Sequence, residues 1–211
     1  MDFEFGILCL DTFMSNSKLK YYILNKPYGV LTQFTDDENR PTLASLYNFS
    51  EDVYPVGRLD MDSEGLLLLT NDKPLTNYLL NPKQKHEREY FAQVEGIPTK
   101  EALQKFCEGI IIEGKKTLPA KAKLIDDPNF PQRVPPIRER KNIPTSWISL
   151  TLIEGRNRQV RKMTAAVGFP TLRLVRVRIE NLYLGNLKVG EVKEISEREL
   201  NVKTRHAASL R

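Results

Sequence analysis

Asp60 is placed where its carboxylate could take part in catalysis. Asp60 follows Gly57 in a short polar stretch between two apolar runs, residues 53–56 and 65–70. Both runs are expected to be extended, and the second to be a buried strand. A charged carboxylate between core strands is costly to desolvate, so it normally has a cationic partner or a catalytic task. The structural alternative is an aspartate that accepts hydrogen bonds from backbone amides of a tight turn.

A second aspartate in the same stretch permits a different chemistry. Asp60 and Asp62 resemble the Asp-x-Asp pattern of metal-dependent phosphatases of the haloacid-dehalogenase type, and the acidic pair at 126–127 could supply a second metal-binding element. However, the chain lacks the alternating strand–helix order of that fold, and Arg58 would compete with Mg²⁺ for the carboxylates. The phosphatase is therefore the minor alternative. Without a metal, Asp62 and Glu64 are expected to be turn and surface residues.

Basic residues are concentrated in the C-terminal half. Between Arg133 and Arg178, eleven Arg and Lys stand against two Glu, so this segment carries +9 while the rest of the chain sums to −4. Such asymmetry indicates a polyanionic partner. Residues 154–163 place four cations at the beginning of an expected helix, where the helix dipole favours anions, so phosphate or a buried carboxylate is expected to meet them. A solvated basic face is the alternative, and a non-catalytic RNA-binding module would use the same face.

Tyr90 is the aromatic residue with two interpretations. A tyrosine in a strand is most often a core aromatic with its hydroxyl at the rim. Against a nucleic acid, the same ring is a stacking platform for an unstacked base.

The elements that position these residues follow from hydrophobic periodicity and turn residues. Strands outnumber helices and most connections are too short for repeated βαβ crossovers, so the fold class is α+β, with a mixed, mainly antiparallel sheet core and flanking helices. Thr42 and Asn157 are expected to cap the first and last helices. The proline-rich, basic residues 128–144 are expected to form a functional loop. Strands are expected at 21–25, 65–70, 88–94, 110–112, 120–125, 147–153, 172–179 and 190–195, with 30–34 extended, and helices at 42–47, 73–80, 99–108 and 158–167.

The expected organisation is one folded unit. Residues 20–197 form it, after an N-terminal extension, residues 1–19, that is expected to be disordered and before a loose polar tail, residues 198–211. Met14 is a candidate for the true translation start.

Composition excludes several functional classes. Two cysteines and two histidines are too few for a disulfide framework, a zinc site or a Ser-His-Asp triad. No apolar run approaches the roughly 20 residues that span a bilayer, and the first residues lack the basic region of a secretory signal. A cytoplasmic protein is expected, and nothing in the sequence demands more than a monomer.

Four motifs together resemble those of the RNA pseudouridine synthases, in the small-subunit-A-like branch. They occur in that family's order and cover roughly residues 21–195. The basic loop at 135–147 most resembles a short type within the branch that acts on large-subunit ribosomal RNA. The matching segments are KPYG (26–29) for the first motif, GRLD with SEGLLLLTND (57–60 and 63–72) for the catalytic motif, REY (88–90) for the basic-x-Tyr motif, and EGRNRQVRKM (154–163) for the third motif.

The resemblance implies a fold and a reaction. Two lobes would share one sheet, with the active site in the cleft between them. The enzyme would isomerise a uridine of 23S-type large-subunit ribosomal RNA to pseudouridine, without a cofactor or a metal.

The resemblance also implies roles for particular residues. Asp60 would start the reaction, by attacking the uracil ring or the ribose or by assisting glycosidic cleavage. Tyr90 would stack on the flipped uracil and could remove the C5 proton, and Arg161 would hold Asp60 ionised. Arg58 would help to extrude the base. Two further basic residues are expected to contact phosphate or the motif turn, Lys26 and Arg158.

Overall fold

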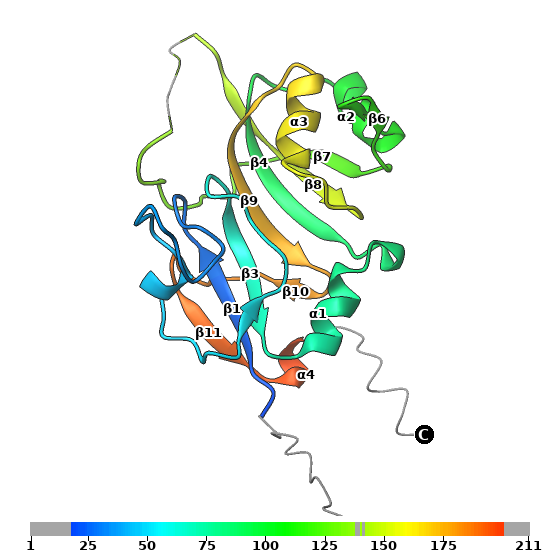
Figure 1. Cartoon of the computed structure of the whole chain (residues 1–211). Coiled ribbons are helices and arrows are strands. Elements are labelled where there is room, and N and C mark those ends of the chain that lie inside the picture. The colour runs from blue at the N-terminus through cyan, green and yellow to red at the C-terminus, as the bar shows by residue number, and fades with distance from the viewer. Residues whose placement is uncertain (1–17, 138–139, 141, 201–211) are drawn as a thin grey trace, which may run out of the picture.

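One β-sheet organises the chain. In the computed structural model, which describes residues 18–137, 140 and 142–200, nine strands join in this sheet. They are β1 (Tyr21–Lys26), β2 (Tyr54–Pro55), β3 (Glu64–Thr70), β4 (Arg88–Glu95), β7 (Lys121–Ile125), β8 (Thr145–Leu152), β9 (Thr171–Ile179), β10 (Leu182–Tyr183) and β11 (Val192–Ile195). The main path runs β11-β1-β3-β9-β4-β8-β7, with β2 on β3 and β10 on β9 (Figure 1). The strands pair antiparallel except β3 with β9, so the expected α+β class with a mainly antiparallel sheet is confirmed.

The remaining elements flank this sheet. A small hairpin is formed by β5 (Ile111–Ile112) and β6 (Lys115–Lys116). None of the helices in the described ranges has the length and apolar content that crossing a membrane requires. The helices are α1 (Lys73–Leu80), α2 (Lys100–Glu108), α3 (Gln159–Ala166) and α4 (Glu197–Leu200), with short 3₁₀ turns at Leu43–Ser45 and Pro82–Gln84.

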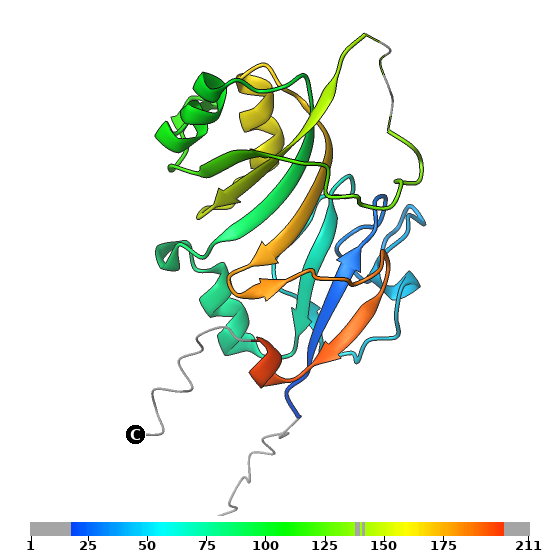
Figure 2. The same ribbon diagram turned by 180° about the vertical axis from the view of Figure 1, so that it is seen from behind.

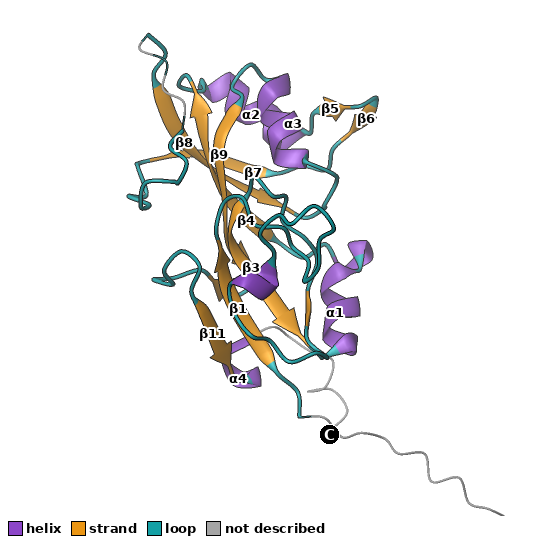
Figure 3. Cartoon of the chain, turned by 60° about the vertical axis from the view of Figure 1, so that its left-hand side comes forward, coloured by secondary structure: helices purple, strands orange, loops and turns teal. Residues whose placement is uncertain are grey.

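The sheet has two halves with separate coverings. Figures 1 and 2 show β1, β3 and β11 at one end with α1 and α4, and β4, β7, β8 and β9 at the other end with α2 and α3. Seen from the side, α1 lies beside the lower half of the sheet and α2 and α3 beside the upper half (Figure 3). The two halves meet where β3 and β9 pair, which matches the expected arrangement of two lobes sharing one sheet.

The centre of the sheet explains the unbroken apolar run of β3. All seven of its residues are buried. Leu66 and Leu68 belong to one core cluster with α1, while Leu67 and Leu69 belong to another with the loop segment around Leu43. A strand covered on both faces needs apolar side chains at every position rather than at alternate ones.

The join between the halves is short and depends on a glycine. Only Glu64 with Val175 and Gly65 with Arg176 are paired between β3 and β9. Gly65 has φ +102°, and a Cβ there would collide with the backbone of Arg176. Glycine is therefore required for this close approach of two strands.

Some local expectations are wrong. Residues 32–34 form bends rather than a continuing strand, and Thr42 makes no side-chain cap. Asn157 does not cap α3, because Arg158 takes the N-cap position in the left-handed region, with φ 51° and no side-chain cap. Gln159 holds the turn that precedes the helix, since its Oε1 accepts from the Arg156 N–H at 2.9 Å.

The chain ends need one correction. Residues 198–200 belong to α4 rather than to a loose tail, and Leu200 is buried in the cluster that α1 covers. The expectations for residues 1–17, Met14 included, and for 201–211 lie outside the described residues.

The long loop between β7 and β8 is held against the sheet. Its described residues have no helix or strand, as expected for 128–144. Phe130 packs on Trp147 with a ring-centroid distance of 5.7 Å, and Arg133 lies 4.1 Å above the ring of Tyr28. The loop therefore reaches the turn that follows β1.

Candidate active site

A cleft of about 730 Å³ lies at the junction of the two halves. Its walls come from the turn before β3, the end of α1, the strands β4 and β9, and the segment between β8 and α3. Of the six residues with predicted site roles, four line the cleft: Arg58, Asp60, Tyr90 and Arg158. Lys26 and Arg161 are not among its lining residues.

The turn that carries Asp60 is braced from behind. Thr32 Oγ1 donates to the carbonyl oxygen of Leu59 at 2.6 Å and accepts from the Leu59 N–H at 3.2 Å. The N–H of Gly29 donates to the carbonyl oxygen of Met61 at 2.8 Å. These bonds fix the backbone on both sides of Asp60, whose side chain is 37% exposed at the cleft.

Lys26 supports the same region from the interior. Its side chain is fully buried, and Nζ donates to the carbonyl oxygens of Pro27 at 2.9 Å and Val30 at 2.6 Å. Burial lowers the pKa of Lys26 to about 8. Full burial disfavours the expected phosphate contact, and the alternative, a contact to the motif turn, is indirect: Lys26 bonds residues 27 and 30, and the Gly29 N–H bonds Met61.

The cationic partners of the two aspartates differ from the expected ones. Arg158 Nη1 lies 3.6 Å from Asp60 Oδ2, and both Nη atoms of Arg158 bond the carboxylate of Asp62, at 2.9 and 2.6 Å. Arg161 lies with its Nε 3.3 Å from Asp62 Oδ2 and donates to the Asp62 carbonyl oxygen at 2.6 Å. The expected direct pair of Asp60 with Arg161 is therefore corrected: Arg158 pairs with Asp60, and Arg161 holds Asp62.

Asp62 links the turn that carries Asp60 to the beginning of α3. Burial raises the pKa of Asp62, but the Arg158 hydrogen bonds and the charge of Arg161 outweigh it and lower the pKa below its usual range. An ionised Asp62 thus fixes both arginines on the turn, and Arg158 can reach Asp60 from there. Asp62 was expected to be a simple turn residue, so this bridging contact was missed.

Tyr90 lines the cleft from β4. On β4 it is paired with Leu150 of β8 and Arg176 of β9, so its ring stands between these neighbours on the sheet. It is partly buried and packs against the core cluster under α3. One side of the ring is thus supported by the core while the residue still lines the cleft, which both interpretations of Tyr90 require. Arg58 is exposed at the rim.

Glu64 is not a surface residue. Its side chain is 5% exposed, and its two oxygens pair with Nη2 and Nε of Arg173 at 2.8 and 2.9 Å. The expectation is corrected because β3 is central and the pairing strand β9 supplies the cation.

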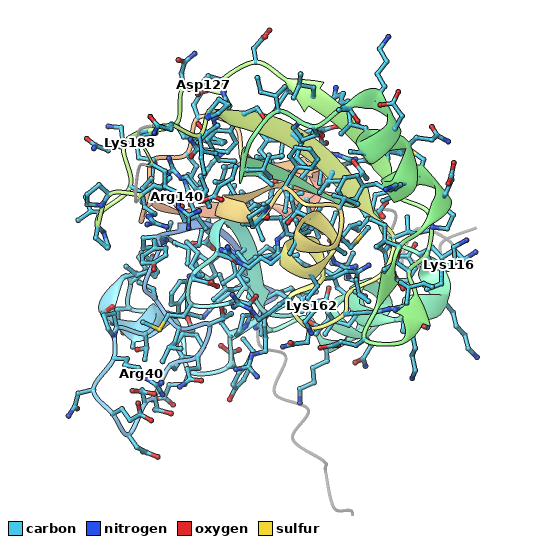
Figure 4. The ribbon with its side chains drawn as sticks, turned by 90° about the horizontal axis from the view of Figure 1, so that it is seen from above. Arg40, Lys116, Asp127, Arg140, Lys162 and Lys188 are labelled. Atoms are coloured by element: carbon cyan, nitrogen blue, oxygen red, sulfur yellow. The ribbon has the colours of Figure 1, made fainter. Side chains whose placement is uncertain are left out.

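The basic segment is also less free than its charge count suggests. Arg178 pairs with Glu87 and Glu89, both at 2.9 Å. Lys162 on α3 and Lys116 on the β5–β6 hairpin are seen from above in Figure 4, and Lys162 pairs with Glu113 at 2.7 Å. Some of the basic residues that give this segment its charge of +9 therefore form ion pairs within the fold and do not contribute to a continuous basic face for a polyanion.

The Asp-x-Asp metal site is disfavoured by the same contacts. A guanidinium within 4 Å of both carboxylates occupies the space where a divalent cation would bind. Among residues 18–137, 140 and 142–200, no three His, Cys, Asp or Glu side chains gather as a possible metal site.

Among the cleft residues without a predicted role are two arginines of the sheet, Arg88 and Arg176. Arg88 precedes Tyr90 by two residues and therefore projects from the same face of β4, a signal that the sequence contained. Arg176 alternates with apolar residues of β9, which alone could not distinguish a solvated position from a cleft position.

The geometry can be compared with known proteins. The family model for RNA pseudouridylate synthase matches residues 20–166. Ribosomal large subunit pseudouridine synthase E of Vibrio parahaemolyticus is 52% identical over 176 residues, covering 83% of this chain and 74% of that protein. The protein of the same name from Xanthomonas campestris is 48% identical over 172 residues, covering 80% of this chain and 91% of that one. A crystal structure of a pseudouridylate synthase superposes with a TM-score of 0.72 at 28% identity, over 87% of this chain and 73% of the other. The chain therefore belongs to the RNA pseudouridine synthase family.

Proposed function

We propose that this enzyme converts a uridine in large-subunit ribosomal RNA to pseudouridine, with Asp60 as the reacting carboxylate. The observation that carries the proposal is the convergence of Asp60, Tyr90 and Arg158, from three separate sequence motifs, on one cleft. The substrate class is supported by two relatives, 52% and 48% identical, that are named for the ribosomal large subunit.

The reaction is an isomerisation. The bond between N1 of uracil and C1′ of ribose breaks, the base turns, and a bond between C5 and C1′ forms. The proton on C5 is lost and N1 gains one, so atoms and oxidation level are conserved and the chemistry requires no redox cofactor. The base must first leave its stack to enter a cleft of this kind.

Each of these side chains has a proposed role in the reaction. Asp60, at the opening of the cleft, attacks the base or the ribose or assists cleavage of the glycosidic bond. Arg158 Nη1 lies 3.6 Å from the carboxylate of Asp60. The ring of Tyr90 stacks on the extruded uracil, and its hydroxyl is the group we assign to removal of the C5 proton. Arg58 at the exposed rim contacts the RNA beside the displaced base.

Lys26 and Arg161 act from behind the cleft. Lys26 bonds the turn that braces Met61, and Arg161 holds Asp62. We further propose that the protein is a monomer, since a single chain supplies every proposed group. We also propose that it acts in the cytoplasm.

The test is a map of pseudouridines in ribosomal RNA from cells with and without the gene. One large-subunit pseudouridine should be absent from the deleted strain, and a plasmid copy of the wild type should restore it while Asp60→Asn does not. Restoration by Asp60→Asn would instead identify a non-catalytic RNA-binding protein, and an unchanged map would refute the proposed substrate.

A further inference from the structure

Arg176 is a buried cation without a counter-ion. It is 3% exposed, and among the described residues no carboxylate forms an ion pair with it. Its Nε donates to the carbonyl oxygen of Leu66 at 2.8 Å, while its Nη2 is buried and has no hydrogen-bond partner in the described structure. An unsatisfied buried donor on a charged group is costly, so such a group is expected to have a ligand.

The neighbouring arginines of β9 show what a structural role looks like in this strand. Arg173 forms a two-point pair with Glu64, and Arg178 pairs with Glu87 and Glu89. Arg176 lies between them in the strand and has no such carboxylate. The difference separates Arg176 from the arginines that stabilise the fold.

A second buried polar group faces the same cleft. Ser63 is 2% exposed, lines the cleft, and its Oγ has no hydrogen-bond partner among the described residues. Arg88, which also lines the cleft, donates to the carbonyl oxygen of Leu79 at 2.8 Å and adds a second positive charge. The inner part of the cleft is therefore rich in donors and poor in anions.

The position of Arg176 identifies the part of the substrate that it meets. Arg176 is directly opposite Tyr90 across the β4–β9 pair, so the two side chains are neighbours on the sheet. Asp60 is 37% exposed, whereas Arg176 is 3% exposed, so Asp60 lies nearer the opening and Arg176 deeper. In an extruded nucleotide the phosphates and ribose stay near the strand and the base enters first. The group that reaches Arg176 is therefore the base and not a phosphate.

We propose that Arg176 Nη2, assisted by Ser63 Oγ, donates hydrogen bonds to the carbonyl edge of the extruded uracil and stabilises the negative charge that this base acquires during the reaction. This inference rests on the proposed function and names a further substrate contact of the same site. Uracil has two carbonyl oxygens, O2 and O4, which match donors.

The chemistry favours a cation at this place whichever path Asp60 takes. When the N1–C1′ bond breaks, its electron pair stays on the base and is delocalised onto O2 and O4. When Asp60 adds to the ring, the electron pair of the C5–C6 bond moves onto O4. In both cases negative charge grows on a carbonyl oxygen, and a preorganised donor in a water-poor site stabilises it more than it stabilises neutral uracil.

The test combines an enzyme change with a substrate change. Single-turnover pseudouridine formation is measured for wild type and Arg176→Lys on the target RNA carrying uridine, 2-thiouridine or 4-thiouridine at the modified position. Sulfur is a weaker acceptor than oxygen, so the contact is weakened from the substrate side. Arg173→Lys is the matched control, because it alters a buried arginine of the same strand that does not line the cleft.

Arg176→Lys should slow the reaction on uridine by on the order of 10²-fold, with RNA affinity changed by less than about threefold. The ratio of the rates on uridine and thiouridine should differ between wild type and Arg176→Lys by at least about fivefold for one of the two thiouridines. Arg173→Lys should keep the wild-type ratio even if it lowers stability. Ser63→Ala removes only an oxygen that has no hydrogen-bond partner among the described residues. It should change the uridine-to-thiouridine rate ratio in the same direction as Arg176→Lys, and it replaces Arg176→Lys as the test if Arg176→Lys does not fold.

Wild-type ratios in both Arg176→Lys and Ser63→Ala would overturn the inference while leaving the proposed function intact. Absence of pseudouridine formation by the wild type would instead refute the proposed function, and the inference with it.

Discussion

Replacing Glu64 by glutamine tests how the two halves of the sheet are held together. Glu64 on β3 and Arg173 on β9 form a two-point ion pair at 2.8 and 2.9 Å, with side chains 5% and 6% exposed. The backbone pairing at this join involves only two residue pairs, so the side-chain bridge supplements a short ladder. Glutamine has nearly the shape of glutamate, and the change removes the charge while creating little space.

The magnitude follows from leaving the guanidinium of Arg173 buried without its counter-charge. Breaking a buried pair from one side typically costs about 3–5 kcal/mol in the free energy of unfolding. Replacing both partners, as in Glu64→Leu with Arg173→Leu, should recover much of that loss, since no unpaired charge remains. The recovery should be incomplete, because Arg173 also donates to the carbonyl oxygen of Pro131 at 2.9 Å.

The assay is urea unfolding followed by far-UV circular dichroism and by the fluorescence of the single tryptophan, Trp147. Coincidence of the two transitions checks that unfolding is two-state. Glu95→Gln is the control, since its pair with Arg140 at 3.4 Å is more exposed and its loss should cost less than about 1 kcal/mol. A loss below about 1 kcal/mol for Glu64→Gln, or a double variant as unstable as the sum of the two single ones, would refute this account of the join.

Three further predictions concern the site. Burial in the folded state lowers the pKa of Lys26 from 10.5 to about 8, so between about pH 8 and 10.5 the folded state binds fewer protons than the unfolded state and stability rises with pH. Over this pH range the free energy of unfolding in urea should rise by roughly 3 kcal/mol for the wild type relative to Lys26→Met. A difference between the two proteins that does not change with pH would contradict this. Tyr90→Phe should keep RNA affinity but slow product formation, whereas Tyr90→Ala should also weaken binding by about 1–3 kcal/mol in a titration, because stacking is lost. Equal activity of the wild type and Tyr90→Phe would show that the hydroxyl takes no part in the proton transfer. Asp62→Asn should release Arg158 and Arg161 and slow single-turnover conversion on the order of 10²-fold with RNA affinity little changed; wild-type rates would show that this bridge is dispensable.

Much of the fold could be predicted because its signals are local. The apolar run of β3, the alternation of β8, and the Asp72 cap of α1, whose Oδ1 accepts from the Leu75 N–H at 2.9 Å, are written in neighbouring residues. The two-residue strands β6 and β10 were not predicted, and of residues 53–56, expected to be extended, only Tyr54–Pro55 form a strand, β2. Their extent is set by the partner strand rather than by a pattern of their own.

The site could be predicted as a set of residues but not as a set of pairs. Motifs placed Asp60, Tyr90 and Arg158 among the candidates, and the structure brings these three to one cleft. Which arginine meets which aspartate depends on the left-handed turn at Arg158, which redirects side chains at the start of α3. The family resemblance paired Arg161 with Asp60, whereas in the structure Arg161 contacts Asp62.

The contacts of buried charged residues could not be predicted from the sequence either. Glu64 stands in an acidic, polar stretch, and its cation is 109 residues away along the chain. No local pattern predicts a contact of that sequence separation. Arg176 was overlooked for a related reason, because whether an arginine in an alternating strand faces water, a carboxylate or a cleft is decided by the strands on either side.

The central claim is that Asp60 carries the reaction rather than RNA binding. The direct measurement is the single-turnover rate of pseudouridine formation, alongside RNA affinity, for Asp60→Asn, with Asp37→Asn as a control that removes the same charge from an exposed loop. Asp60→Asn should lower the rate by at least about 10³-fold with affinity nearly unchanged, and Asp37→Asn should match the wild type. Pseudouridine formation by Asp60→Asn at a rate near that of the wild type would contradict the account.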